Sequence, residues 1–287
     1  MPIDYQRIKN WKFDEVRQDY TEKDVILYAL GIGLGHDPLD TTELPFVYEK
    51  ALKVFPTMAS VLAYPGFWMQ DPATGIDWVR LVHGEQRMRF HHAFPASGTV
   101  RSRTRVTHVI DKGADKGALV VTERAIHDVS SDTLLATVEQ TTFCRADGGF
   151  GRGDTPPPAL PRVPERAPDH VCSLPTLPQA ALLYRLNADR NPLHVDPAVA
   201  AKAGYPRPIL HGLCTYGIAA HALLKTLCNH DPERLDYLNV RFTAPFYPGE
   251  TLKVEMWAGD AWHVHFQATS AERNTVVLGN GTAGIRP

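Results

Sequence analysis

The chain has 287 residues, of which 44% are hydrophobic and 22% charged, and this balance predicts a folded globular protein. Its 30 basic and 32 acidic residues leave a formal net charge of -2 without a dense basic stretch, which argues against nucleic acid as a partner. No stretch approaches the roughly 20 apolar residues of a membrane span, and the N-terminus lacks the apolar segment of an export signal, so we expect a cytoplasmic protein.

The first half of the chain predicts helical or irregular structure followed by four strands. Apolar and polar residues alternate over residues 87–94, 99–110, 118–129 and 133–144, as in strands that bury one face. Turns are expected at Asp111-Lys112-Gly113 and at Ser130-Ser131-Asp132. These segments therefore predict antiparallel strands joined by short connections.

Prolines interrupt the middle of the chain. Residues 149–170 contain Pro156-Pro157-Pro158 and three further prolines with few apolar residues, a composition typical of extended and exposed segments. We interpret this segment as a linker between an N-terminal domain, residues 1–148, and a C-terminal domain, residues 171–287.

The second half predicts the same order of elements. Helices are expected over residues 178–186, 197–203 and 212–227, and the last of these, rich in Ala and Leu, is expected to be the central helix. Alternation then predicts antiparallel strands, with turns at Pro248-Gly249 and Gly259-Asp260. The predicted strands cover residues 237–242, 251–257, 262–269 and 275–281.

Direct comparison of the two halves indicates an internal duplication. Residues 88–100 align without gaps with residues 240–252, sharing Arg-Phe, a later Phe and a Thr before an aliphatic residue. Upstream, residues 28–40 echo residues 184–196. The first copy has no carboxylate matching Asp189 and no Asn before its Pro, so we predict that only the second copy is catalytic.

A compact polar motif marks the second half. Asp189, Asn191 and His194 place a carboxylate, an amide and an imidazole within six residues, and His211-Gly212 begins seventeen residues after His194. An acid and a base on one rigid turn can activate water and deliver a proton, while a Gly at a helix start can offer a backbone N–H to an oxyanion. Taken singly, these residues also fit an Asx turn, a packed histidine, an Asn-Pro turn and a helix-packing glycine.

The motif and its surroundings resemble the MaoC-like, hydratase 2 family of (R)-specific enoyl-CoA hydratases, which includes the hydratase region of peroxisomal multifunctional enzymes. The resemblance rests on residues 184–196 and 206–217 and on Arg241-Phe242 running into residues 247–252. It extends into the first half through residues 81–86 and 111–113. It implies an α+β fold of the tandem (double) hot-dog type, with antiparallel sheets each wrapped around a central helix.

The resemblance also implies roles for the motif. Asp189 and His194 would share one water, with His194 as its base and Asp189 as the proton donor, although the two roles could be exchanged. Asn191 would hold the water or the dyad, and the Gly212 N–H would stabilise the thioester oxyanion. The product would be (3R)-3-hydroxyacyl-CoA, in a reversible reaction that needs no cofactor.

Further substrate contacts follow from the same resemblance. The acyl-CoA contacts of the family map onto His83, Gly84, Lys112 and Phe242, with Lys112 as a contact for a CoA phosphate and Phe242 as a wall of the acyl path. On the catalytic turn we add Arg190, Pro192 and Leu193. One position departs from the family, because Ala188 stands where Gly usually precedes the catalytic Asp.

Other functions stay open at this level. A catalytically silent first half favours medium, long or bulky acyl groups, but a hot-dog thioesterase or a non-catalytic acyl-CoA-binding protein would use the same scaffold. No metal is expected, because the four cysteines include no C-x-x-C pair and the close pairs His91, His92 and His263, His265 lack an evident third ligand. A homodimer is expected from the resemblance.

Overall fold

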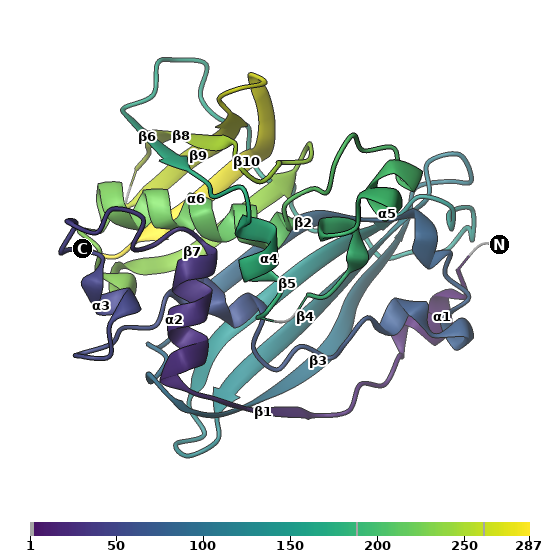
Figure 1. Cartoon of the computed structure of the whole chain (residues 1–287). Helices are drawn as coiled ribbons and strands as arrows, with labels where there is room; N and C mark the ends of the chain where they lie inside the picture. The colour runs from purple at the N-terminus through teal and green to yellow at the C-terminus, as the bar shows by residue number, and fades with distance from the viewer. Residues whose placement is uncertain (1–2, 188, 261) are drawn as a thin grey trace.

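Ten antiparallel strands form one continuous sheet in the computed structural model, which describes residues 3–187, 189–260 and 262–287 (Figure 1). The strand order is β1-β3-β4-β5-β2-β7-β10-β9-β8-β6. The strands are β1 (Val16–Tyr20), β2 (Leu81–Phe90), β3 (Gly98–Asp111), β4 (Ala118–Asp128), β5 (Leu134–Cys144), β6 (His170–Pro175), β7 (Leu235–Phe242), β8 (Thr251–Ala258), β9 (His263–Ser270) and β10 (Thr275–Ile285).

The two halves of the sheet have the same topology. Taken from the outer edge to the centre, the first half runs β1-β3-β4-β5-β2 and the second runs β6-β8-β9-β10-β7. In each half the first strand along the chain is the outer edge and the second lies at the centre. The halves join where β2 pairs with β7, with Met88 opposite Leu238. This repeated order agrees with the internal similarity of the sequence, while the domain bounds drawn at the linker stay a prediction.

Helix α6 (Gly212–Leu227) has the bounds expected from the sequence and lies against β6, β7 and β8 (Figure 1). It is apolar on nearly all sides, so it becomes a core helix instead of a surface one. The shorter helices are α1 (Tyr5–Lys9), α2 (Glu22–Gly31), α3 (Leu44–Val47), α4 (Ala180–Tyr184) and α5 (Pro197–Lys202).

The first half differs from the expectation that each sheet wraps around a central helix. Between β1 and β2 the longest helix is α2, with 10 residues, and it packs against α3, α4 and β1. Between α3 and β2 the described chain forms only short 3-10 turns, of which η1 (Pro56–Ser60) contacts α6. Pro56 and Pro72 begin two of these turns, and Gly66 and Gly75 adopt positive φ, so a long helix cannot form there.

The proline-rich linker is held against the molecule over part of its length. Residues 149–169 form neither helix nor strand, as expected, but β6 already begins at His170. The Asp154 carboxylate accepts hydrogen bonds from the Tyr5 hydroxyl and the Lys9 ammonium group. Leu160 is buried and its carbonyl accepts from Asn280. The segment is therefore extended but not exposed throughout.

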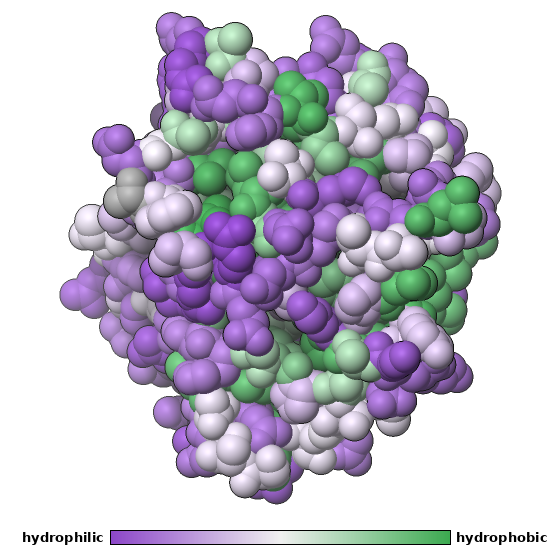
Figure 2. Space-filling model, turned by 90° about the vertical axis from the view of Figure 1, so that its left-hand side faces the viewer, coloured by the Kyte–Doolittle hydropathy of each residue, from purple (hydrophilic) through white to green (hydrophobic). Residues whose placement is uncertain are grey.

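One large apolar core spans both halves and includes α6, while a smaller core lies under β3 and β4 near α1. The four cysteines, all within the described residues, are free. On the face drawn in Figure 2, hydrophobic residues reach the surface as separate patches among hydrophilic ones. Among the described residues, no helix combines the length and the hydrophobicity needed to cross a membrane.

Candidate active site

The Asp189 to His194 turn is built by side chains that bond to their own backbone. The Asp189 Oδ1 atom accepts from the Asn191 N–H at 3.0 Å, and Asn191 Oδ1 accepts from the Leu193 N–H at 3.0 Å. Asn191 thereby caps the short turn η5 (Pro192–His194), where Pro192 presets the backbone. These are the turn bonds that the sequence analysis gave as the alternative interpretation of Asp189 and Asn191, and they hold the carboxylate and the imidazole on one turn.

His194 presents one basic nitrogen to Asp189. Its Nδ1 atom lies 2.9 Å from the Ile209 carbonyl oxygen, which can only accept, so Nδ1 carries the proton and Nε2 does not. Nε2 lies 3.9 Å from Asp189 Oδ2. Burial lowers the pKa of His194, because the charged form loses hydration. The neutral imidazole required of a general base is therefore favoured near neutral pH.

His211, which the sequence prediction used only as part of the motif, lies directly beside the pair. Its ring stacks on that of His194 with centroids 3.7 Å apart, and its Nε2–H donates to the Asp189 carbonyl at 3.1 Å. The Asp189, His194 and His211 ligand atoms all lie within 4.8 Å of one another. A nearly parallel stack does not direct both ring lone pairs at one point, so we do not assign a metal ion to this cluster.

Gly212 is the first residue of α6 and packs against Phe242. A Cβ atom at Gly212 would lie 3.1 Å from Phe242 Cε1, so an alanine there would require the ring to shift by a few tenths of an ångström. The N–H groups of the first helical turn lack partners within the helix and carry the positive end of its dipole. Both interpretations of Gly212, packing and oxyanion binding, are therefore compatible at this position.

His83 and Gly84 reach the same place from the other half of the sheet. The His83 and Phe242 ring centroids are 4.5 Å apart, across the junction of β2 and β7. The pairing of β2 with β5 shifts register around Gly84, where a Cβ would lie 3.3 Å from the Thr141 carbonyl. Burial lowers the pKa of His83 to about 4. The predicted substrate contacts His83, Gly84 and Phe242 are thus brought together with Gly212.

The other predicted contacts lie at the surface. Arg190 and Pro192 are exposed on the catalytic turn, and Leu193 is half-buried. Lys112 is exposed at the end of β3, where its N–H donates to the Gly117 carbonyl, and no described side-chain contact joins it to the cluster. Ala188, where the sequence departs from the family, lies outside the described residues.

Tyr184 is a neighbour of the cluster that the sequence prediction did not name as a site residue. Its ring centroid lies 5.0 Å from that of His211, and its side chain is buried. The signal in the sequence was its place at the start of residues 184–196, the stretch on which the family resemblance rests. We therefore add His211 and Tyr184 to the residues that surround the dyad.

Comparison with known proteins identifies the family. The MaoC like domain matches residues 160–280 and the MFE-2 hydratase 2 N-terminal domain matches residues 18–146. An enoyl-CoA hydratase of Mycobacterium tuberculosis is 39% identical over 282 residues, covering 97% of both chains. The peroxisomal enoyl-CoA hydratase 2 of Arabidopsis thaliana is 38% identical over 290 residues, covering 93% of this chain and 91% of the relative.

Solved structures superpose on nearly the whole chain. A MaoC-like dehydratase from Phytophthora capsici superposes with a TM-score of 0.87 at 32% identity, covering 98% of each chain. A Mycobacterium tuberculosis protein described as a double hot-dog fold superposes with a TM-score of 0.56 at 16% identity over 96% of each chain, which supports the fold alone. The chain therefore belongs to the hydratase 2 family of MaoC-like, double hot-dog hydro-lyases.

Proposed function

We propose that this protein catalyses the reversible, (R)-specific hydration of trans-2-enoyl-CoA to (3R)-3-hydroxyacyl-CoA. The observation that carries the proposal is the meeting of Asp189 Oδ2 and the unprotonated Nε2 of His194 at 3.9 Å. The names of the relatives, enoyl-CoA hydratase and enoyl-CoA hydratase 2, support the same reaction class.

The dyad would act on a single water. His194 Nε2 takes one proton from the water, the oxygen forms a bond to C3, and the C2–C3 π electrons move toward the thioester carbonyl. The Gly212 N–H stabilises the oxygen that gains this charge. In this assignment the carboxyl group of Asp189 supplies the proton to C2, and proton transfer from His194 to Asp189 restores both groups. With the two roles exchanged, the Asp189 carboxylate takes the proton from the water and His194 supplies the proton to C2. Dehydration runs through the same steps in reverse.

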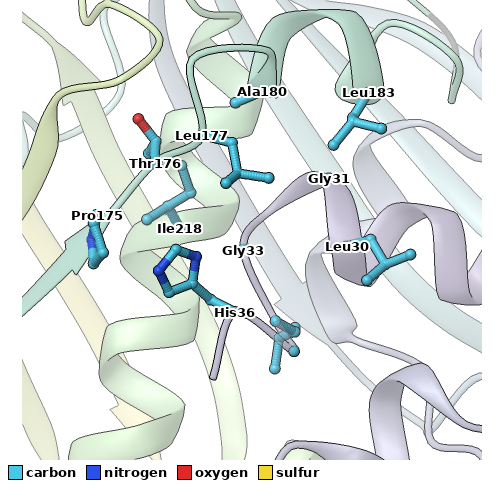
Figure 3. Close-up of a pocket in the computed structure, with 12 residues that line it drawn as sticks. Leu30, Gly31, Gly33, His36, Pro175, Thr176, Leu177, Ala180, Leu183 and Ile218 are labelled. Atoms are coloured by element: carbon cyan, nitrogen blue, oxygen red, sulfur yellow. The ribbon is translucent and has the colours of Figure 1, made fainter. Parts of the chain in front are cut away.

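The first half would supply space for the acyl group. Between β1 and β2 the first half has the shorter helices α2 and α3 and several 3-10 turns, where the second half has the long helix α6. An apolar cavity of about 150 Å³ opens between the end of α2, the chain after β6 and the middle of α6 (Figure 3). Leu30, Leu177 and Ile218 are among its lining residues. Ile218 lies six residues beyond Gly212 on α6, roughly 9 Å along the helix, so a medium or long acyl chain directed along α6 would reach this cavity.

The test is hydration of short, medium, long and bulky trans-2-enoyl-CoA by the purified protein, followed through the absorbance of the conjugated thioester and by chiral analysis of the product. Asp189→Asn and His194→Ala should each lower kcat by roughly 10²–10⁴-fold. The exposed turn residue Asp115, changed to Asn, is the matched control and should leave kcat unchanged. Near-normal turnover in either dyad variant would refute the assignment.

The same assay separates the alternatives. Release of free CoA from saturated and unsaturated acyl-CoA alike would indicate a thioesterase, and tight binding of acyl-CoA without turnover would indicate a binding protein. The expectations of a homodimer, of a cytoplasmic location and of no cofactor remain predictions, and the Arabidopsis relative is named peroxisomal.

A further inference from the structure

His211 contacts both members of the proposed dyad, although the reaction above gives it no chemical step. Its side chain is 1% exposed. The ring stacks on His194 at 3.7 Å with an interplanar angle of 27°, and its Nε2 lies 3.1 Å from the Asp189 carbonyl oxygen. Its own peptide leads directly into Gly212, because His211 is the N-cap of α6. One residue therefore touches the base, the acid and the helix start.

The hydrogen bonds of His211 define its tautomer. The Asp189 carbonyl can only accept, so Nε2 carries the proton. Nδ1 is buried and has no partner among the described residues, so it is left as a bare lone pair. A second proton at Nδ1 would add a buried, unpaired donor beside His194. The ring is therefore held neutral by its surroundings.

The charged and titratable groups around this ring favour the same state. Burial, and after it the neighbouring His194, lowers the pKa of His211 to about 4. Arg185 also lowers this pKa, whereas Asp189 raises it. Tyr184 packs on the ring from α4 with centroids 5.0 Å apart. His194 keeps one free ring nitrogen, because its Nδ1 donates to Ile209. His211 thus adds bulk and a hydrogen bond to the site without adding a charge.

We infer that His211 is a positioning residue, whose ring fixes the plane of His194 and whose Nε2–H fixes the backbone of Asp189. Rotation of the His194 ring about its Cβ–Cγ bond is opposed by the Ile209 hydrogen bond and by the stack with His211. Without the stack, Nε2 can turn away from Asp189 and from the shared water. The catalytic consequence rests on the proposed function, whereas the geometric consequence for His194 does not.

Two substitutions separate the ring from the donor. His211→Phe keeps an aromatic ring against His194 but removes the bond to the Asp189 carbonyl. His211→Gln keeps an N–H donor at the position of Nε2 but removes the stack. Both should lower kcat by about 10- to 100-fold, because small misplacements of catalytic groups are costly, while KM should change by less than about threefold, because His211 is not proposed to touch the substrate. His170→Gln, at the exposed start of β6, is the matched control.

NMR titration of the imidazoles gives a readout that does not depend on turnover. The pKa of His194 is lowered chiefly by burial, so it should rise in His211→Gln, where the covering ring is lost, and stay low in His211→Phe. The acid limb of the kcat profile should move to higher pH only in His211→Gln. His211→Phe preserves the buried volume, so its kcat can still be measured if the Gln variant does not fold.

The outcomes are distinct. Unchanged kcat in both folded variants, or a His194 titration identical to that of the parent protein in His211→Gln, would overturn the inference. Loss of thermal stability with an unchanged kcat would also overturn it, because the role would then be purely structural. A parent protein that fails to hydrate enoyl-CoA, yet shows the His194 shift in His211→Gln, would remove the proposed function and leave the positioning role in place.

Discussion

Glu43 is a buried carboxylate that ties the first half of the chain to α6. It is 3% exposed, and its Oε1 accepts from His221 Nε2 at 2.8 Å while its Oε2 accepts from the Gly35 N–H at 2.8 Å. Lys225 Nζ lies 3.4 Å away. Burial alone would raise the pKa of Glu43, but the bonds from His221 and Gly35 and the charge of Lys225 outweigh it and lower the pKa to about 2. We predict that Glu43→Gln destabilises the fold.

The size of this effect follows from the shift. A fall in the pKa from 4.5 to about 2 corresponds to about 3 kcal/mol, at roughly 1.4 kcal/mol per unit. Because the folded pKa is lowered, this stability is fully present above pH 4.5 and is lost as the pH falls from 4.5 towards 2. At pH 7 the free energy of unfolding of the Gln variant should therefore be about 3 kcal/mol lower than that of the parent protein. This difference should shrink as the pH falls below 4.5.

Urea unfolding followed by circular dichroism at several pH values measures both quantities. The matched control is Glu49→Gln, an exposed residue in the same region, which should change the free energy of unfolding by less than about 0.5 kcal/mol. A Glu43→Gln variant as stable as the control at pH 7 would refute the reasoning. A deficit that stays constant down to pH 3 would show that Glu43 stabilises the fold by shape and not by its charge.

Three further predictions concern α6 and the dyad. At Gly217 a Cβ would lie 2.6 Å from Ile32 Cγ2, so Gly217→Ala should lower the free energy of unfolding by about 1–3 kcal/mol through overpacking. In urea unfolding, the double variant Gly217→Ala with Ile32→Ala should lose less stability than the sum of the two single variants. Gly212→Ala should leave the melting temperature nearly unchanged but lower kcat, because its Cβ would stand 3.1 Å from Phe242 Cε1 at the proposed oxyanion position; an unchanged kcat would contradict that placement. Since burial lowers the pKa of His194, its neutral form persists below its ordinary pKa of 6.5, and the kcat profile should lose activity only at a pH below 6.5.

Local patterns in the sequence predict the regular elements well where one face is buried. The bounds of α6 agree with the expectation because apolar and small residues dominate the stretch from Gly212 to Leu227. The edge strands β1 and β6 were not predicted, because each is short and buries few side chains completely. β1 has the sequence VRQDY, and β6 is exposed or half-buried throughout. Such strands are fixed by pairing with β3 and β8, which no local pattern reveals.

The candidate site divides in the same way. The meeting of Asp189 with His194 is set by Asx bonds within six residues, so their spacing alone indicates it. The approach of His211 depends on the path of residues 195–210. The sequence of a turn such as Asp111-Lys112-Gly113 does not indicate how far the turn lies from the dyad. The resemblance assigned Lys112 to the substrate, but among the described residues no side-chain contact joins Lys112 to the cluster.

The junction of β2 and β7 gives the first half of the chain a structural part in the candidate site. His83 comes from β2 and Phe242 from β7, and the two rings meet at 4.5 Å beside Gly212 of α6. Neither half alone holds all three, because the contact exists only where the central strands pair. A first half without its own dyad, as the sequence predicts, would therefore still be needed to complete this contact, because His83 reaches Phe242 only from β2.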